Sequence, residues 1–276
     1  MGTEAVSAAS AAIHPAAEAM SAATPLVGSA PISGLLQGLY WFILVPGVYL
    51  SIVAFIAFSA ARIVRIARAA PLPYPLAIYP EPRHPIRQAL RDTFGMSQVY
   101  RRDRKFWAFL MMYHLGFLLL IVGHLDLFPN ISVVSEQSRH MVGAGLVGVL
   151  VTLPTFFFLG RRFRSPVREL STPGDYLLLL LLLFVFLFGD LISWGNSWTA
   201  KGFVMTKQDF AEYFRILGSF SFADPRTVLP GSHYHFIVIH VLLAELFLAV
   251  LPFTKIVHTF FALPLNAIRR LPWTRK

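Results

Sequence analysis

Five apolar runs, each long enough to form a membrane-spanning helix, dominate this 276-residue sequence. A helix needs about 20 apolar residues to cross roughly 30 Å of hydrocarbon. Only 14% of the residues are charged, whereas soluble domains carry about 25%. The sequence therefore predicts an all-α integral membrane protein with five transmembrane helices, at about 35–61, 106–128, 140–159, 176–192 and 234–263.

The basic residues predict how these helices cross the membrane. All but five of the 24 Lys and Arg residues lie between the first and second runs, between the third and fourth, or near the C-terminus. Because basic loops stay on the cytoplasmic side, we expect the N-terminus outside and the C-terminus in the cytoplasm of a bacterial or archaeal inner membrane. The basic residues that give the net charge of +10 would face the lipid headgroups on the cytoplasmic side. The charge therefore predicts no nucleic-acid partner.

The segments around the bundle differ in composition. We expect an exposed Ala/Ser/Pro-rich arm (1–33), a five-helix bundle (34–265) and a basic tail (266–276). Within the bundle we expect a large cytoplasmic loop (70–105) and a large outer loop (193–233). The proline-rich and then basic cytoplasmic loop is either a solvated linker at the lipid headgroups or a docking surface. The outer loop contains an amphipathic stretch, 209–217, that predicts an interfacial helix capping the bundle. Proline and glycine at 46–47 predict a kink in the first helix.

Four histidines inside two of the apolar runs are the candidate functional residues. His114 and His124 lie in the second run, and His240 and His258 in the fifth. Ionisable groups in hydrocarbon are costly, so each is a functional hypothesis. A single buried histidine is often a hydrogen-bonded packing residue, but four on two antiparallel helices favour a shared ligand. The chain has no cysteine, which excludes thiolate-bound iron–sulfur clusters and thioether-attached haem.

The topology predicts how the four imidazoles pair by depth. The second and fifth helices cross in opposite directions, so His124 meets His240 near the outer face and His114 meets His258 near the inner face. The spacings do not match: ten residues rise about 15 Å and eighteen rise about 27 Å in a helix. We expect a bend at Pro252 to absorb part of the difference. Two haems, each held by two imidazoles, would satisfy this pattern.

Several neighbouring residues have two interpretations. Glycines of the second and third helices either make room for a flat macrocycle or allow close helix packing; they are Gly116, Gly123, Gly143, Gly145 and Gly148. Glu245, on the far side of the helix from His240, serves either a proton path or an interhelical hydrogen bond. A group of basic residues at the inner face pairs either with haem propionates and a partner or with lipid phosphates: Arg101, Arg102, Arg104, Lys105 and Arg269.

The pattern His114-x-Gly116-x6-Gly123-His124, followed by His240-x17-His258, resembles the gamma subunit of respiratory nitrate reductase. It is also similar to the membrane cytochrome b of the sulfite-reduction-associated electron-transfer complex. The resemblance implies a dihaem cytochrome b with His124 and His240 on the outer haem and His114 and His258 on the inner one. It further implies a menaquinol or ubiquinol site near the outer haem. Electrons would pass between this site and a cytoplasmic iron–sulfur or catalytic subunit of a respiratory oxidoreductase complex, in the direction of either quinol oxidation or quinone reduction.

The quinone site is less defined. The family's quinol-site lysine has no obvious counterpart between His124 and the third helix, so Asp126, Arg139 and His140 are the candidates. Quinol protons would leave outward, helped by residues at the same face, for which interfacial solvation is the plainer interpretation: Asp126, Glu136, His140 and Asp190. We expect an electron-transfer subunit rather than a complete enzyme. The alternatives are a haem-free proton-coupled transporter, although no inverted repeat is visible, and a structural membrane anchor.

Overall fold

The structure is a computed structural model that describes residues 34–68, 84–134, 145–198, 206–229 and 234–270. The chain divides into two compact units, Met1–Leu39 and Tyr40–Lys276, and the bundle lies in the second. All regular structure in the described ranges is helical. The expected N-terminal arm lies outside them.

Four helices in the described part of the chain are long and apolar enough to cross a membrane: Gly34–Ile66, Arg104–Leu125, Pro173–Gly195 and Tyr234–Phe253. They confirm the membrane class and match four of the five predicted spans. The remaining predicted span, 140–159, begins outside the described residues. Its described part lies in α8 (Val147–Arg162), whose 16 residues are mostly apolar but too few to count as a span alone. Five spans and the direction of crossing stay predictions.

The first span consists of α2 (Gly34–Phe42), a π-helical turn (Ile43–Gly47) and α3 (Val48–Ala67). Pro46 lies inside the turn, where its missing N–H breaks the regular helical ladder. A single wide turn accommodates this break without ending the helix. The predicted irregularity at this proline therefore takes the form of a π turn.

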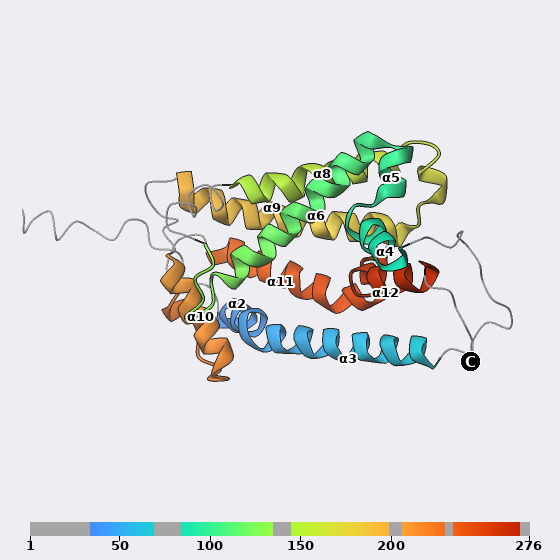
Figure 1. Cartoon of the computed structure of the whole chain (residues 1–276). Helices are drawn as coiled ribbons and strands as arrows, with labels where there is room; N and C mark the ends of the chain where they lie inside the picture. Colours follow the sequence, from blue (N-terminus) through green and yellow to red (C-terminus); the bar gives the residue numbers. More distant parts are fainter. Residues whose placement is uncertain (1–33, 69–83, 135–144, 199–205, 230–233, 271–276) are drawn as a thin grey trace, which may run out of the picture. The chain divides into compact units, whose positions relative to one another are not determined.

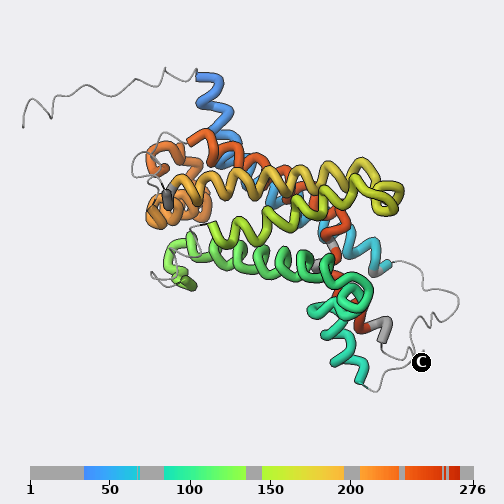
Figure 2. Tube along the Cα trace, turned by 90° about the horizontal axis from the view of Figure 1, so that it is seen from above, coloured from blue at the N-terminus to red at the C-terminus, as the bar shows by residue number. Residues whose placement is uncertain are grey.

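The long helices in the described part of the chain run side by side through the bundle (Figures 1 and 2). In packing order, α6 (Arg104–Leu125) contacts α8, α8 contacts α9 (Pro173–Trp198), α9 contacts α11 (Tyr234–Val250), and α11 contacts α3. Many of their large apolar side chains are exposed, which suits helices surrounded by lipid. The buried core is correspondingly small and lies in two separate clusters.

Short helices lie at the two ends of this bundle (Figure 1). Helix α10 (Lys207–Gly218) lies at one end, where Thr206 and Asp209 cap its first turn reciprocally; it matches the predicted amphipathic helix. At the other end lie α4 (Pro85–Phe94), α5 (Ser97–Arg102) and α12 (His258–Arg270). Helices α4 and α12 pack together. The basic half of the predicted cytoplasmic loop is thus helical.

The predicted fifth helix, 234–263, is wrong as a continuous element. Helix α11 ends at Val250, and two short 3₁₀ turns, Leu251–Phe253 and Lys255–Val257, precede α12. Pro252 has no N–H to continue the helix, and Thr254 is extended. His258 therefore does not lie on an extension of α11, and the calculated 27 Å spacing from His240 does not apply.

Candidate functional site

The structure brings the four intramembrane histidines together in two pairs. The ring centroids of His124 and His240 lie 6.4 Å apart with 23° between the planes. Those of His114 and His258 lie 6.1 Å apart with 66° between the planes. We call them the outer pair and the inner pair after the predicted topology. Both pairings are the ones that depth along antiparallel helices predicts.

Each of the four imidazoles uses its Nδ1 atom for a backbone contact. The acceptors are the carbonyl oxygens of Leu110 for His114 (2.7 Å), Leu120 for His124 (2.8 Å), Val185 for His240 (3.0 Å) and Lys255 for His258 (3.0 Å). A carbonyl oxygen only accepts, so each Nδ1 carries the proton and each Nε2 keeps a free lone pair. This is how proteins orient histidines that bind a metal through Nε2.

The distances within the pairs fit a metal between two imidazoles. With metal–nitrogen bonds of about 2 Å on both sides and ring centres 1.1 Å beyond each nitrogen, the centroids would lie roughly 6.2 Å apart. Each pair offers only two nitrogens, and the described residues contain no group of three or more His, Cys, Asp or Glu that could hold a metal ion. A macrocycle that supplies the remaining ligands, as haem does, is therefore the metal group that these pairs fit.

The glycines beside the histidines divide by what surrounds them. A Cβ on Gly123, next to His124, would meet nothing within 4 Å. A Cβ on Gly189 of α9 would lie 3.1 Å from Cε1 of His240, so this glycine lets the ring sit against the helix. Sequence reasoning missed Gly189, because only the fold brings it to His240.

The other glycines pack helices. A Cβ on Gly116 would lie 2.7 Å from Cβ of Leu150, and one on Gly148 would lie 1.6 Å from Oδ1 of Asp190. Gly145, with a φ of +103°, faces Trp194 in the same way. Close helix packing, the plainer interpretation, therefore describes Gly116, Gly145 and Gly148. Gly143 lies outside the described residues.

An ion pair lies directly after the outer pair in sequence. Asp126 follows α6, is 4% exposed, and its Oδ1 accepts hydrogen bonds from Val133 N–H (2.8 Å) and Val134 N–H (3.1 Å). Nζ of Lys207, the first residue of α10, lies 3.3 Å from the same oxygen. Burial raises the pKa of the Asp126 carboxyl, but these donors outweigh it, so the pKa lies below its ordinary value. Asp126 is therefore an anion at neutral pH.

Lys207 is a residue that sequence reasoning missed. It lies outside the stretch between His124 and the third helix, because it belongs to α10, far along the chain. Its sequence signal was only its place at the start of the amphipathic stretch. Two of the predicted quinone-site residues, Arg139 and His140, and the proposed proton group Glu136 lie outside the described residues.

Two further carboxyl groups lie within the bundle. Asp190 on α9 is buried and accepts a hydrogen bond from Oγ1 of Thr152 (2.8 Å). Glu245 on α11 lies against Gly47 of the π turn, where a Cβ would come 2.7 Å from Oε1. Oε1 is buried without a hydrogen-bond partner in the described structure. This contact spans two helices but does not choose between the two roles expected for Glu245.

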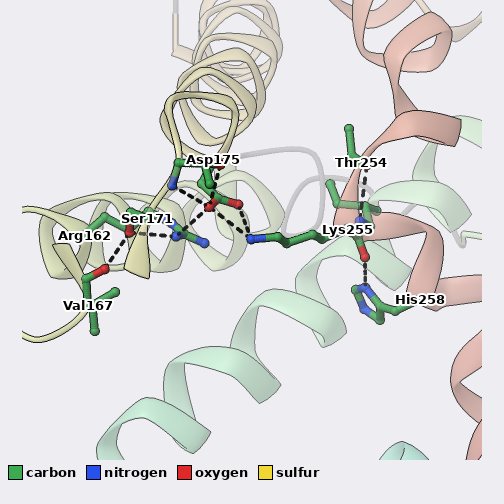
Figure 3. Close-up of polar contacts among 9 residues, drawn as sticks. Arg162, Val167, Ser171, Asp175, Thr254, Lys255 and His258 are labelled. Atoms are coloured by element: carbon green, nitrogen blue, oxygen red, sulfur yellow. Dashed lines mark hydrogen bonds and ion pairs between the residues drawn. The ribbon is translucent and has the colours of Figure 1, made fainter. Parts of the chain in front are cut away.

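A second ionic network lies beside the inner pair (Figure 3). Asp175, in the first turn of α9, has a side chain only 6% exposed, and its Oδ1 lies 2.9 Å from Nζ of Lys255. Its Oδ2 lies 3.5 Å from Nη1 of Arg162. The backbone carbonyl of Lys255 is the acceptor for Nδ1 of His258. The network therefore reaches the inner pair through one residue.

Basic side chains cluster at the same end of the bundle. Arg101, Arg102, Arg104 and Lys105 are exposed, and the guanidinium of Arg104 lies 5.4 Å from the ring centre of Tyr100. The side chain of Arg269 is not among those described. Exposure leaves these cations available to anionic groups, whether of a partner or of lipid.

Comparison with known proteins places these features in a family. The model of the nitrate reductase gamma subunit family matches residues 87–274, which is more than half of the chain. The nitrate reductase gamma chain of Bacillus subtilis is 29% identical over 65% of this chain and 83% of its own length.

Two other relatives are longer than the matched region. The Hdr-like menaquinol oxidoreductase cytochrome b-like subunit of Archaeoglobus fulgidus is 28% identical over 62% of this chain and 53% of its own length. The nitrate reductase-like protein NarX of Mycobacterium tuberculosis is 28% identical over 62% of this chain and 28% of its own length. All four intramembrane histidines lie within the matched residues, and the chain belongs to the nitrate reductase gamma subunit family.

Proposed function

We propose that this chain is the dihaem cytochrome b subunit of a respiratory oxidoreductase complex. It would carry electrons between a membrane quinol, at the end of the bundle with α10, and an iron–sulfur partner at the basic end. The observation that carries the proposal is the arrangement of the four imidazoles in two pairs. The ring centroids lie 6.4 Å apart in the outer pair and 6.1 Å apart in the inner pair, and every Nδ1 contacts a backbone carbonyl. Family membership and a relative named as a menaquinol oxidoreductase subunit support it.

In this proposal the protein would hold and orient the two haems. His124 and His240 would hold the outer haem, and His114 and His258 the inner one. Held by two imidazoles each, the haems would supply one-electron transfer at these two positions. The hydrogen bonds from Nδ1 to the backbone carbonyls would fix the orientation of each ring.

The quinol would bind near the outer pair. Asp126 is ionised, so it suits accepting a hydrogen bond from a quinol hydroxyl rather than storing its proton. Lys207 would donate to a quinone oxygen from the opposite side of that carboxylate. Arg139 and His140 complete the proposed site, and the released protons would leave outward, helped by Asp126, His140, Glu136 or Asp190. Either menaquinone or ubiquinone meets these requirements.

The partner would dock at the basic end. The cations at the start of α6 and in α5 face the solvent there, where they suit acidic groups of a cytoplasmic protein. The relatives are named as subunits of nitrate reductase and of menaquinol oxidoreductase, so the partner would be the catalytic or iron–sulfur subunit of a comparable complex. Nothing in the described residues selects nitrate as its substrate.

Quinol-driven reduction tests the proposal. The chain is purified with its native partner subunits, mixed anaerobically with a short-chain menaquinol or ubiquinol, and followed by its visible absorption. We expect reduction of b-type haem in wild type and its loss in His124→Ala. A protein that contains no haem, or whose haem no quinol reduces, would overturn the proposal. The haem-free outcome would favour the transporter or the anchor.

A further inference from the structure

One of the four histidine supports differs from the others. The carbonyls that orient His114, His124 and His240 belong to regular helices, α6 and α9. The carbonyl that orients His258 belongs to Lys255, in the short turn between α11 and α12. A turn of this length lacks the repeated hydrogen bonds that fix a helical carbonyl. The backbone N–H of His258 also donates to the Lys255 carbonyl, and side chains add to this single backbone hydrogen bond.

Two side-chain interactions hold this turn (Figure 3). Oγ1 of Thr254 donates to the carbonyl of Leu251 (2.9 Å) and accepts from Ile256 N–H (3.2 Å). Nζ of Lys255 bonds both oxygens of Asp175, at 2.9 Å and 3.0 Å. The first interaction is local to the turn. The second ties the turn to α9, eighty residues away in sequence.

The Asp175 side chain, which pairs with Lys255, is itself held firmly in place. Its Oδ2 also accepts hydrogen bonds from the backbone N–H and Oγ1 of Thr172, both at 3.0 Å, so it closes the first turn of α9 as in a capping box. The carboxylate is buried, while the Lys255 side chain is 74% exposed. The rigid partner of the pair is therefore the aspartate, and the lysine follows it.

We propose that Asp175 is a positioning residue for His258. Through Lys255 it fixes the carbonyl that orients the inner imidazole, and thereby sets the ligand field and the affinity of the inner haem only. This inference rests on the proposed haem-binding function. It predicts that a salt bridge outside the haem ligands controls one of the two sites and leaves the other unchanged.

The test breaks the Asp175–Lys255 ion pair by replacing either partner and compares the result with loss of the α9 helix cap. Asp175→Asn and Lys255→Gln break the ion pair, whereas Thr172→Ala weakens the cap of α9 and keeps the pair. Each variant is purified with its partners, and the two haem midpoint potentials and low-spin electron paramagnetic resonance signals are measured. Loss of such an outer support typically lowers metal-site affinity by about tenfold or more.

We expect both ion-pair variants to shift the inner signal and potential and to release the inner haem about tenfold faster. The outer signal, and both signals of Thr172→Ala, should match wild type. Unchanged signals in both ion-pair variants, or equal changes at both haems in all three single variants, would overturn the inference. A wild type without haem would instead overturn the proposed function.

Discussion

The outer and inner histidine pairs have almost the same separation but different supports. The outer pair joins two continuous helices, and its rings are nearly parallel, at 23°. The inner pair joins α6 to the start of α12, beyond the break in the fifth span, and its rings are twisted by 66°. A site built on regular helices depends on packing, whereas a site built at a chain break depends on the side chains that hold the break.

Single replacements of the haem ligands should give the largest difference between the outer and inner sites. His124→Ala should remove the outer haem and His258→Ala the inner one, because each iron loses one of its two protein ligands. The haem content should fall from two per chain to one in each variant, as measured by the pyridine haemochrome assay.

Quinol reduction separates the two losses. The protein with His258→Ala should still be reduced by quinol at the outer haem, and the protein with His124→Ala should not. If both single variants kept two haems, the pairing would be wrong.

The glycines near the two α6 histidines should differ in how much their replacement by alanine destabilises the fold. Gly116→Ala places a Cβ 2.7 Å from Leu150, an overpacking that should cost about 1–3 kcal/mol. Gly123→Ala should cost far less, since nothing lies within 4 Å. Thermal unfolding of the two purified variants measures the difference. The larger replacement Gly123→Leu should lower outer haem content alone, and equal destabilisation by both alanine variants would contradict this picture.

The ion pair at the outer end predicts a smaller, pH-dependent effect. The folded pKa of Asp126 is lowered, so its contribution to stability is present above the unfolded pKa and is lost as the pH falls through the folded pKa. Lys207→Met removes one of the causes of the lowered pKa and should bring this loss of stability to a higher pH.

Hydrogen exchange in α10 as a function of pH measures this effect. Arg215→Met is the matched control, because Arg215 pairs with the exposed Glu212 one turn away on the same helix. The same pH profile in both variants would show that the Asp126 pair does not anchor α10.

Much of this architecture could be predicted because it depends on properties averaged over many residues. Hydropathy over about 20 residues located four spans that the structure confirms, and the direction of crossing predicted which histidines meet. The mismatch between the two histidine spacings could not be resolved from sequence. It depends on where α11 ends, and Pro252 and Thr254 decide this locally.

The polar partners could not be predicted for a different reason. Asp126 with Lys207, and Asp175 with Lys255, join residues about eighty positions apart in sequence. Charge patterns in a single sequence identify which end a residue occupies but not its neighbour there. The caps were visible locally, since Thr172 and Thr206 each precede an aspartate by three residues.

Electron paramagnetic resonance of the oxidised, purified protein tests the central claim most directly. Bis-imidazole haems are low-spin, and the angle between the imidazole planes governs the anisotropy of the signal. We predict two low-spin signals, with the more anisotropic one from the twisted inner pair and the more rhombic one from the nearly parallel outer pair. A spectrum without any low-spin haem signal would contradict the claim that these histidines grip haem iron.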